Sequence, residues 1–169
     1  QRARSALLAA ESFFAQTEAR LSRFRPDSEL SRLNRAAGQP FGASPVLFDL
    51  VAEALAWRDR TGGIFDPAVL NALIASGYDR TFAAIKADDA NTGESGASVN
   101  ADASAGLAYA SAGAVVDSSG IVLGRGRQIL LPAGVGIDLG GIAKGWTIQQ
   151  VAHRLGMWGP CLVDAGGDI

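Results

Sequence analysis

The sequence is poor in the residues on which several kinds of catalytic and metal site depend. Its 169 residues include one cysteine, one histidine and one methionine. The single cysteine, Cys161, excludes an intrachain disulfide and a multi-cysteine zinc site, and its apolar neighbours predict a buried thiol. The single histidine, His153, falls in a predicted helix beside Arg154. A Ser-His-Asp or Cys-His enzyme built from this chain alone would have to use it, and we favour a structural position instead.

Long hydrophobic runs and an excess of charge are also absent. No run approaches the roughly 20 apolar residues of a membrane span. Fifteen Lys and Arg against seventeen Asp and Glu leave a net charge of -2, which gives no general attraction to nucleic acid or anionic membrane. Hydrophobic residues make up 48% of the chain, enough for a packed core. Arginines cluster near the N-terminus, and we interpret them as solvated helix faces: Arg20, Arg23, Arg25, Arg32 and Arg35.

The two ends of the sequence lack the usual marks of a complete chain. It opens with Gln1, shows no signal peptide, and closes on the glycine-rich residues 165–169. A glycine turn of this kind normally leads into more protein. We therefore expect a fragment, or one piece of a cleaved chain, truncated at its C-terminal side.

Apolar periodicity and capping residues predict helices in the first half. Residues 7–24 place an apolar residue every three or four positions, from Leu7 onward, and Pro26 ends this helix. A short second helix starts near Asp27 or Ser28. Ser44-Pro45 opens a third, whose apolar stripe runs to Trp57 before two glycines stop it. Asp66-Pro67 repeats the start signal for a short helix that reaches Gly77.

The second half reads differently. Residues 86–119 form a long Gly/Ala/Ser-rich loop, in which 113–116 could still pair as a strand. Two short apolar runs, 121–123 and 128–131, predict a hairpin. Residues 135–139 and 161–164 are predicted strands, and a helix separates them. The whole chain thus predicts one α+β domain, with a mainly helical part over 1–85 and strands plus one helix over 120–169.

The most informative stretch is residues 136–146 (GIDLGGIAKGW). A strand ends at a carboxylate, Asp138, two glycines let the backbone turn tightly, and a helix begins. The first N–H groups and positive dipole end of such a helix form an anion site, and Lys144 projects from its first turn. The alternative interpretation is a structural Asp138–Lys144 salt bridge that only trims the turn.

Three further stretches each have an ordinary structural explanation on their own. In residues 61–67 (TGGIFDP), Asp before Pro is a good N-cap, although Phe65 could also face a flat ring. Residues 21–34 (LSRFRPDSELSRLN) suit an inter-helix connection. Residues 163–168 (VDAGGD) suit any tight turn.

Together, and in this order, the four stretches resemble the ApbE family, the FAD:protein FMN transferases formerly described as thiamine-biosynthesis lipoproteins. The match to its motifs spans about residues 18–168. The resemblance implies an α+β fold with antiparallel sheets of the T-fold kind, flanked by helices, with FAD in a cleft between two lobes.

The resemblance also implies binding residues. Phe24 takes the place of an aromatic residue, usually tyrosine, that packs on FAD. Ile64, Phe65 and Asp66 are implied FAD contacts, with Asp66 the side chain we favour. Asp138 and Lys144 are further implied contacts. The backbone carbonyl of Gly141 would bind a Mg²⁺ ion, whose acidic and threonine ligands would lie beyond Ile169 with the rest of the catalytic machinery.

The activity implied is Mg²⁺-dependent transfer of FMN from FAD to a threonine of an acceptor protein, with release of AMP. The fragment alone would be inactive. Two alternatives stay open: an FAD-binding protein or Mg²⁺-dependent FAD pyrophosphatase without protein transfer, and a non-catalytic interaction domain. Family members are commonly extracytoplasmic lipoproteins, but no lipobox cysteine stands in this sequence, so the cytoplasm stays open as a location.

Overall fold

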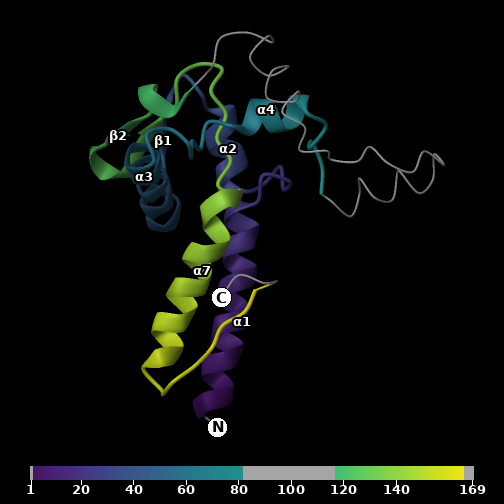
Figure 1. The fold of residues 1–169 in the computed structure, drawn as a ribbon, viewed down its shortest axis with the longest axis vertical. Coiled ribbons are helices and arrows are strands. Elements are labelled where there is room, and N and C mark those ends of the chain that lie inside the picture. The colour runs from purple at the N-terminus through teal and green to yellow at the C-terminus, as the bar shows by residue number, and fades with distance from the viewer. Residues whose placement is uncertain (1, 82–116, 166–169) are drawn as a thin grey trace, which may run out of the picture.

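The computed structural model describes residues 2–81 and 117–165, and Figure 1 shows their arrangement. Two long helices form a stalk, and the remaining elements gather in a head at one end of it. The helices are α1 (Arg2–Leu21), α2 (Glu29–Arg35), α3 (Pro45–Arg60), α4 (Leu70–Ala75) and α7 (Gly140–Gly156), with two 3-10 turns, η1 (Ser118–Gly120) and η2 (Arg125–Arg127). The strands are β1 (Pro40–Gly42), β2 (Val122–Gly124) and β3 (Gln128–Leu130).

The sheet is small and antiparallel, in the order β1-β3-β2. Ile129 at the centre of β3 is fully buried and pairs with Phe41 on one side and Leu123 on the other. The predicted hairpin over 121–131 is therefore confirmed as β2 and β3. Strand β1 was not predicted, because three residues that include a proline and a glycine carry almost no strand signal.

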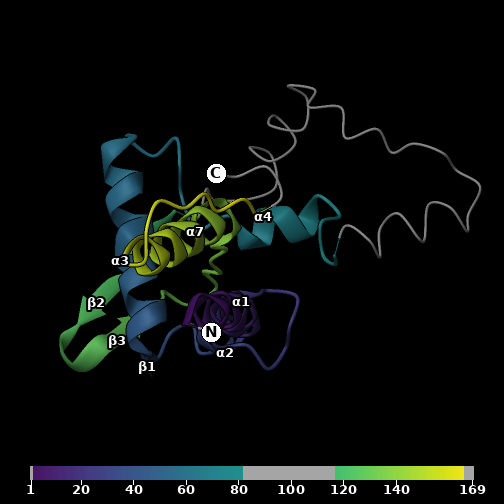
Figure 2. The ribbon, with the colours of Figure 1, turned by 90° about the horizontal axis from the view of Figure 1, so that it is seen from below.

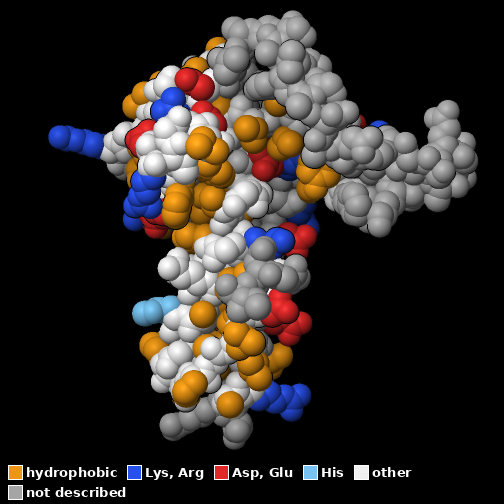
Figure 3. Space-filling view, in the orientation of Figure 1, with side chains coloured by type: hydrophobic (Ala, Val, Ile, Leu, Met, Phe, Trp, Pro, Cys, Tyr) orange, Lys and Arg blue, Asp and Glu red, His pale blue; other side chains and the backbone are white. Residues whose placement is uncertain are grey.

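The stalk consists of α1 and α7, which run antiparallel and side by side (Figures 1 and 2). Thr17 and Leu21 of α1 are buried together with Ile148 and Val151 of α7. None of the helices in the two described parts of the chain is long and apolar enough to cross a membrane. At the free end of the stalk, apolar side chains lie on the surface (Figure 3), and Leu7, predicted to face inward, is 61% exposed.

The core lies in the head, where α2 and α3 pack on the sheet. Leu30, Leu33, Leu47 and Leu50 are fully or almost fully buried there. Both helices begin as the sequence predicts, since the Ser28 hydroxyl accepts the N–H of Ser31 and the Ser44 hydroxyl accepts that of Leu47. Trp57 is a partial exception in the apolar stripe of α3, because its side chain is 44% exposed.

Two predicted strands are wrong. Residues 135–139 are largely buried, but they join no sheet among the described residues. Their backbone groups bind a side chain and a loop instead: Ile137 pairs with Asn34, and the Asp138 N–H donates to the Pro67 carbonyl. Burial of an apolar run produces the same sequence pattern as a core strand, and the pattern carries no information on what the backbone binds.

Residues 161–164 are likewise not a strand, and Cys161 is exposed rather than buried. The apolar neighbours that suggested a buried thiol are not all inside, since Leu162 is 77% exposed. Helix α4 also begins later than predicted, at Leu70, because Asp66 bonds the N–H of Ala68 in a turn that precedes it. The predicted loop over 86–119 and its strand at 113–116 lie almost entirely outside the described residues.

Candidate functional site

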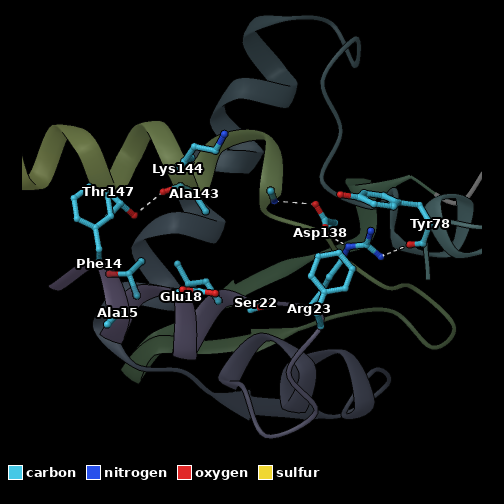
Figure 4. A pocket seen from close by; sticks show the side chains of 14 residues that line it. Phe14, Ala15, Glu18, Ser22, Arg23, Tyr78, Asp138, Ala143, Lys144 and Thr147 are labelled. Carbon is cyan, nitrogen blue, oxygen red and sulfur yellow. Dashed lines mark hydrogen bonds and ion pairs between the residues drawn. The ribbon is translucent and has the colours of Figure 1, made fainter. Parts of the chain in front are cut away.

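A pocket of about 590 Å³ opens where the end of α1, the first turns of α7 and Tyr78 meet (Figure 4). One wall is the α1 face that carries Phe14, Glu18 and Leu21. The opposite wall is the turn into α7, with Asp138 and Lys144. The pocket is therefore built mainly from two segments far apart in the sequence, residues 14–24 and 138–147. The turn singled out in the sequence forms one side of it.

The turn into α7 is shaped by Asp138. One carboxylate oxygen, Oδ1, accepts the N–H of Gly140 at 2.8 Å. Leu139 occupies the N-cap position of α7 and supplies no capping side chain, so the Asp138 carboxylate takes over part of that role. The N–H groups of Ile142 and Ala143 donate to the Leu139 carbonyl, so what the start of α7 offers a ligand is mainly its positive dipole end, which suits an anionic group.

The second oxygen of Asp138 binds Arg23, which lies two residues after the end of α1. Arg23 Nε lies 3.0 Å from Asp138 Oδ2, and its side chain is only 7% exposed. Its Nη1 donates to the backbone carbonyl of Tyr78 at 2.7 Å. The expectation that Arg23 belongs to a solvated helix face is thus wrong, because a carboxylate 115 positions away in the sequence neutralises it inside the fold.

Two aromatic rings flank the Arg23 guanidinium. Its central carbon lies 4.3 Å from the centre of the Phe24 ring and 4.4 Å from that of Tyr78, within the range of cation–π contacts. The two rings meet edge to face, with centroids 5.8 Å apart. Phe24 therefore lines the pocket as the sequence suggested. Sequence reasoning missed Tyr78, which follows the end of α4 and belongs to none of the four motifs.

Lys144 is the fifth residue of α7, and its exposed side chain lines the pocket. The ion pair that the structure shows for Asp138 is with Arg23 rather than with Lys144. Three of the predicted binding residues, Phe24, Asp138 and Lys144, are thus brought together around one pocket. Their contact with FAD stays a prediction.

The other predicted contacts lie beside this pocket rather than in its wall. Ile64 is 93% exposed. Phe65 packs against the start of α7, so closely that a Cβ added to Gly141 would stand 3.1 Å from the Phe65 ring. A side chain at position 141 would therefore push Phe65 away. The Gly141 carbonyl stays the predicted Mg²⁺ ligand, but the described residues hold no group of three or more His, Cys, Asp or Glu that could complete a metal site.

Asp66 is occupied by contacts within the protein. Its carboxylate accepts the N–H groups of Ala68 at 2.8 Å and Ser118 at 3.2 Å, and Arg58 Nε lies 3.3 Å away. Desolvation lowers the pKa of Arg58, but the bond to Asp66 and the charge of Asp117 outweigh it and leave that pKa raised. The side-chain bond from Ser119 is the main reason why the pKa of Asp117 is lowered. Asp66 thus joins α3 to the segment that leads into β2.

We expect Asp66→Ala to lower the free energy of unfolding by about 1–2 kcal/mol, chiefly because the N–H groups of Ala68 and Ser118 lose their acceptor. Urea denaturation would measure the change. Asp59→Ala serves as the control, because Asp59 also contacts Arg58 at 3.3 Å but is 75% exposed. A variant at position 66 as stable as the control would contradict the structural role.

Comparison with known proteins matches almost all of the chain to one protein family. The sequence model of the ApbE family matches residues 3–169. A protein of Treponema pallidum named FAD:protein FMN transferase is 33% identical over an aligned length of 164, and the match covers 91% of this chain and 40% of that protein. The chain therefore spans well under two thirds of the length of this relative.

Solved structures agree on the fold. The flavinyl transferase ApbE of Pseudomonas stutzeri, in its apo form, matches with a TM-score of 0.67 and 21% identity over 92% of this chain and 47% of that one. A variant of the flavin transferase ApbE of Vibrio cholerae matches with a TM-score of 0.70 and 23% identity over 97% and 52% of the two chains. The predicted α+β fold with an antiparallel sheet and flanking helices is thus confirmed.

Proposed function

The chain belongs to the ApbE family, and on that premise we propose that its pocket between α1 and α7 holds FAD for Mg²⁺-dependent transfer of FMN to a threonine of an acceptor protein. The observation that carries the proposal is the convergence of Phe24, Asp138 and Lys144 on one pocket at the start of a helix. These residues come from two different motifs, separated by more than 100 positions in the sequence.

The reaction balances simply. The threonine oxygen of the acceptor forms a bond to the FMN-side phosphorus of FAD and gives up its proton. The bond from that phosphorus to the bridging oxygen breaks, and AMP leaves with this oxygen. Phosphoryl transfer of this kind asks the protein mainly to position the reactants and to balance charge.

The residues of this chain supply part of that positioning. The positive dipole end of α7 and the Lys144 ammonium offer positive charge to the diphosphate. The Phe24 ring offers a surface on which a flat ring can pack. Asp138 fixes the turn itself through its bond to the Gly140 N–H.

The described residues supply only part of a site for Mg²⁺. The Gly141 carbonyl is one oxygen ligand of the kind Mg²⁺ accepts, but the described residues do not form a magnesium site on their own, since no cluster of three His, Cys, Asp or Glu is present among them. We therefore derive no step through the metal. The remaining ligands would come from outside the described residues. From the resemblance to the family, we also propose that this chain by itself does not turn over.

The test uses the full-length protein, FAD and Mg²⁺, with and without extracts of the source organism as a supply of acceptor. We expect AMP release together with a fluorescent, covalently flavinylated protein band when acceptor is present. Equal release of free FMN and AMP without acceptor would favour the FAD pyrophosphatase instead. Failure to bind FAD at all would leave the non-catalytic interaction domain.

Lys144→Ala should weaken FAD binding roughly tenfold, because the diphosphate loses a charge-assisted partner. Titration calorimetry on the full-length protein would measure it. Riboflavin, which has no phosphate, should bind the variant and the wild type equally. Arg125→Ala is the matched control, since Arg125 is an exposed cation on the hairpin, remote from the pocket. Unchanged FAD affinity in the Lys144 variant would contradict the assignment.

A further inference from the structure

We propose that Arg23 recognises the ring end of the bound nucleotide, by donating a hydrogen bond from Nη2 to an acceptor atom on the edge of a neutral heteroaromatic ring. The inference rests on the proposed function, because it concerns the same pocket. Two of the three guanidinium nitrogens of Arg23 have partners within the protein, and the third has none among the described residues. Nε pairs with Asp138 and Nη1 with the Tyr78 carbonyl, whereas Nη2 is buried and no described residue offers it an acceptor.

The direction of Nη2 is fixed by the other two nitrogens. A guanidinium is planar and presents its N–H groups in a rigid fork. With Nε held at 3.0 Å and Nη1 at 2.7 Å, the group cannot rotate to satisfy Nη2 without giving up a bond. The side chain is also 7% exposed, so it cannot turn out to solvent. A buried donor held in this way is costly to leave unbonded, and an arriving acceptor would relieve that cost.

The surrounding charge favours a neutral acceptor over a phosphate. Arg23 and Asp138 together carry no net charge, and the opposite charges of Glu18 and Lys144, which line the same pocket, leave the lining as a whole without a net charge. A phosphate beside Nη2 would therefore face the Asp138 carboxylate at close range. The edge of a flavin or adenine ring carries oxygen or nitrogen acceptors without a charge, and such a ring also stacks on aromatic side chains and on a guanidinium plane.

The Tyr78 ring lies over the Arg23 guanidinium, with the guanidinium carbon 4.4 Å from its centre. The Tyr78 side chain is 38% exposed, in contrast to the buried Arg23 beneath it. Its backbone is anchored at both polar groups, because its N–H donates to the Leu73 carbonyl at 2.9 Å and its carbonyl accepts from Arg23. The phenol ring can therefore rotate away while the carbonyl keeps Nη1 in place. Figure 4 shows Tyr78 at the edge of the pocket, next to Arg23 and Asp138. A ligand ring would replace the Tyr78 ring over the guanidinium.

The test compares Arg23→Lys with wild type in binding FAD, riboflavin and adenosine to the full-length protein. Lysine keeps the positive charge toward Asp138 but loses the planar fork. We expect FAD binding to weaken roughly tenfold, the value of one charge-assisted hydrogen bond. The same factor should appear with riboflavin if the flavin ring is recognised, or with adenosine if the adenine ring is. Arg25→Lys, two positions along the same connection and 51% exposed, should leave all affinities unchanged.

Tyr78→Ala is the second variant, at a residue that is 38% exposed. It removes the ring that must turn aside, so we expect FAD to bind a few-fold more tightly. The proposal is overturned if Arg23→Lys binds every ligand as the wild type does, if its loss appears only with phosphate-bearing ligands, or if Tyr78→Ala weakens FAD binding. Failure of the wild-type protein to bind FAD would instead refute the proposed function.

Discussion

Replacement of Asn34 by alanine is expected to lower the free energy of unfolding by about 2–4 kcal/mol, since it removes two hydrogen bonds to buried backbone. The Asn34 amide donates from Nδ2 to the Ile137 carbonyl and accepts the Ile137 N–H at Oδ1, both at 2.9 Å. Ile137 is fully buried, so neither backbone group could turn to water once the amide is gone.

Asn34 does for residues 135–139 what a neighbouring strand would otherwise do. It lies at the end of α2 and reaches a segment 103 positions later in the sequence. The next residue in that segment is Asp138, which holds Arg23 and the turn into α7. Loss of Asn34 should therefore weaken FAD binding as well as stability, although Asn34 itself lines no wall of the pocket.

The matched control is Asn71→Ala. Asn71 also donates from Nδ2 to a carbonyl near this segment, that of Gly134 at 2.8 Å, but this bond is single and exposed. We expect it to cost about 0.5–1 kcal/mol. Urea denaturation of both variants gives the comparison, and equal losses for the two would show that the paired bond to Ile137 is not what holds the segment.

Local signals predicted the parts of the fold that depend on local chemistry. Ser28 and Ser44 cap their helices as expected, because a hydroxyl that accepts an N–H three residues on makes a contact within one short segment of sequence. The turn between Asp138 and Lys144 likewise faces a pocket as its residue types suggested.

The features that the sequence did not predict are contacts between residues distant in the chain. Arg23 looks like any surface arginine until Asp138 meets it, and Tyr78 lies in the pocket only because α4 brings it there. Residues 135–139 have the apolar character of a strand, yet their backbone partners are Asn34 and Pro67. No periodicity within one segment encodes a partner in another, which is why long-range pairing had to come from the structure.

The role of Glu29 could not be predicted from the sequence either, because its partner is also distant in the chain. The stretch 21–34, to which it belongs, suggested only a connection between helices. Glu29 is 7% exposed, and both of its carboxylate oxygens bind Ser44. Oε1 accepts the Ser44 N–H at 2.6 Å and Oε2 accepts the Ser44 hydroxyl at 2.7 Å. The Ser44 hydroxyl in turn accepts the Leu47 N–H. Glu29 thus holds the residue that caps α3, and Arg20 Nε adds a contact at 3.5 Å.

Glu29→Ala should therefore lower the free energy of unfolding by about 3–5 kcal/mol, because a buried N–H and hydroxyl lose their acceptor and Arg20 loses its partner. Glu29→Gln keeps the shape and one acceptor oxygen, so it should lose about half as much. Glu53→Ala is the control, since its ion pair with Arg60 is exposed and worth at most about 0.5 kcal/mol. Denaturation curves in which Glu29→Ala matches Glu53→Ala would show that α3 does not depend on this carboxylate for its start.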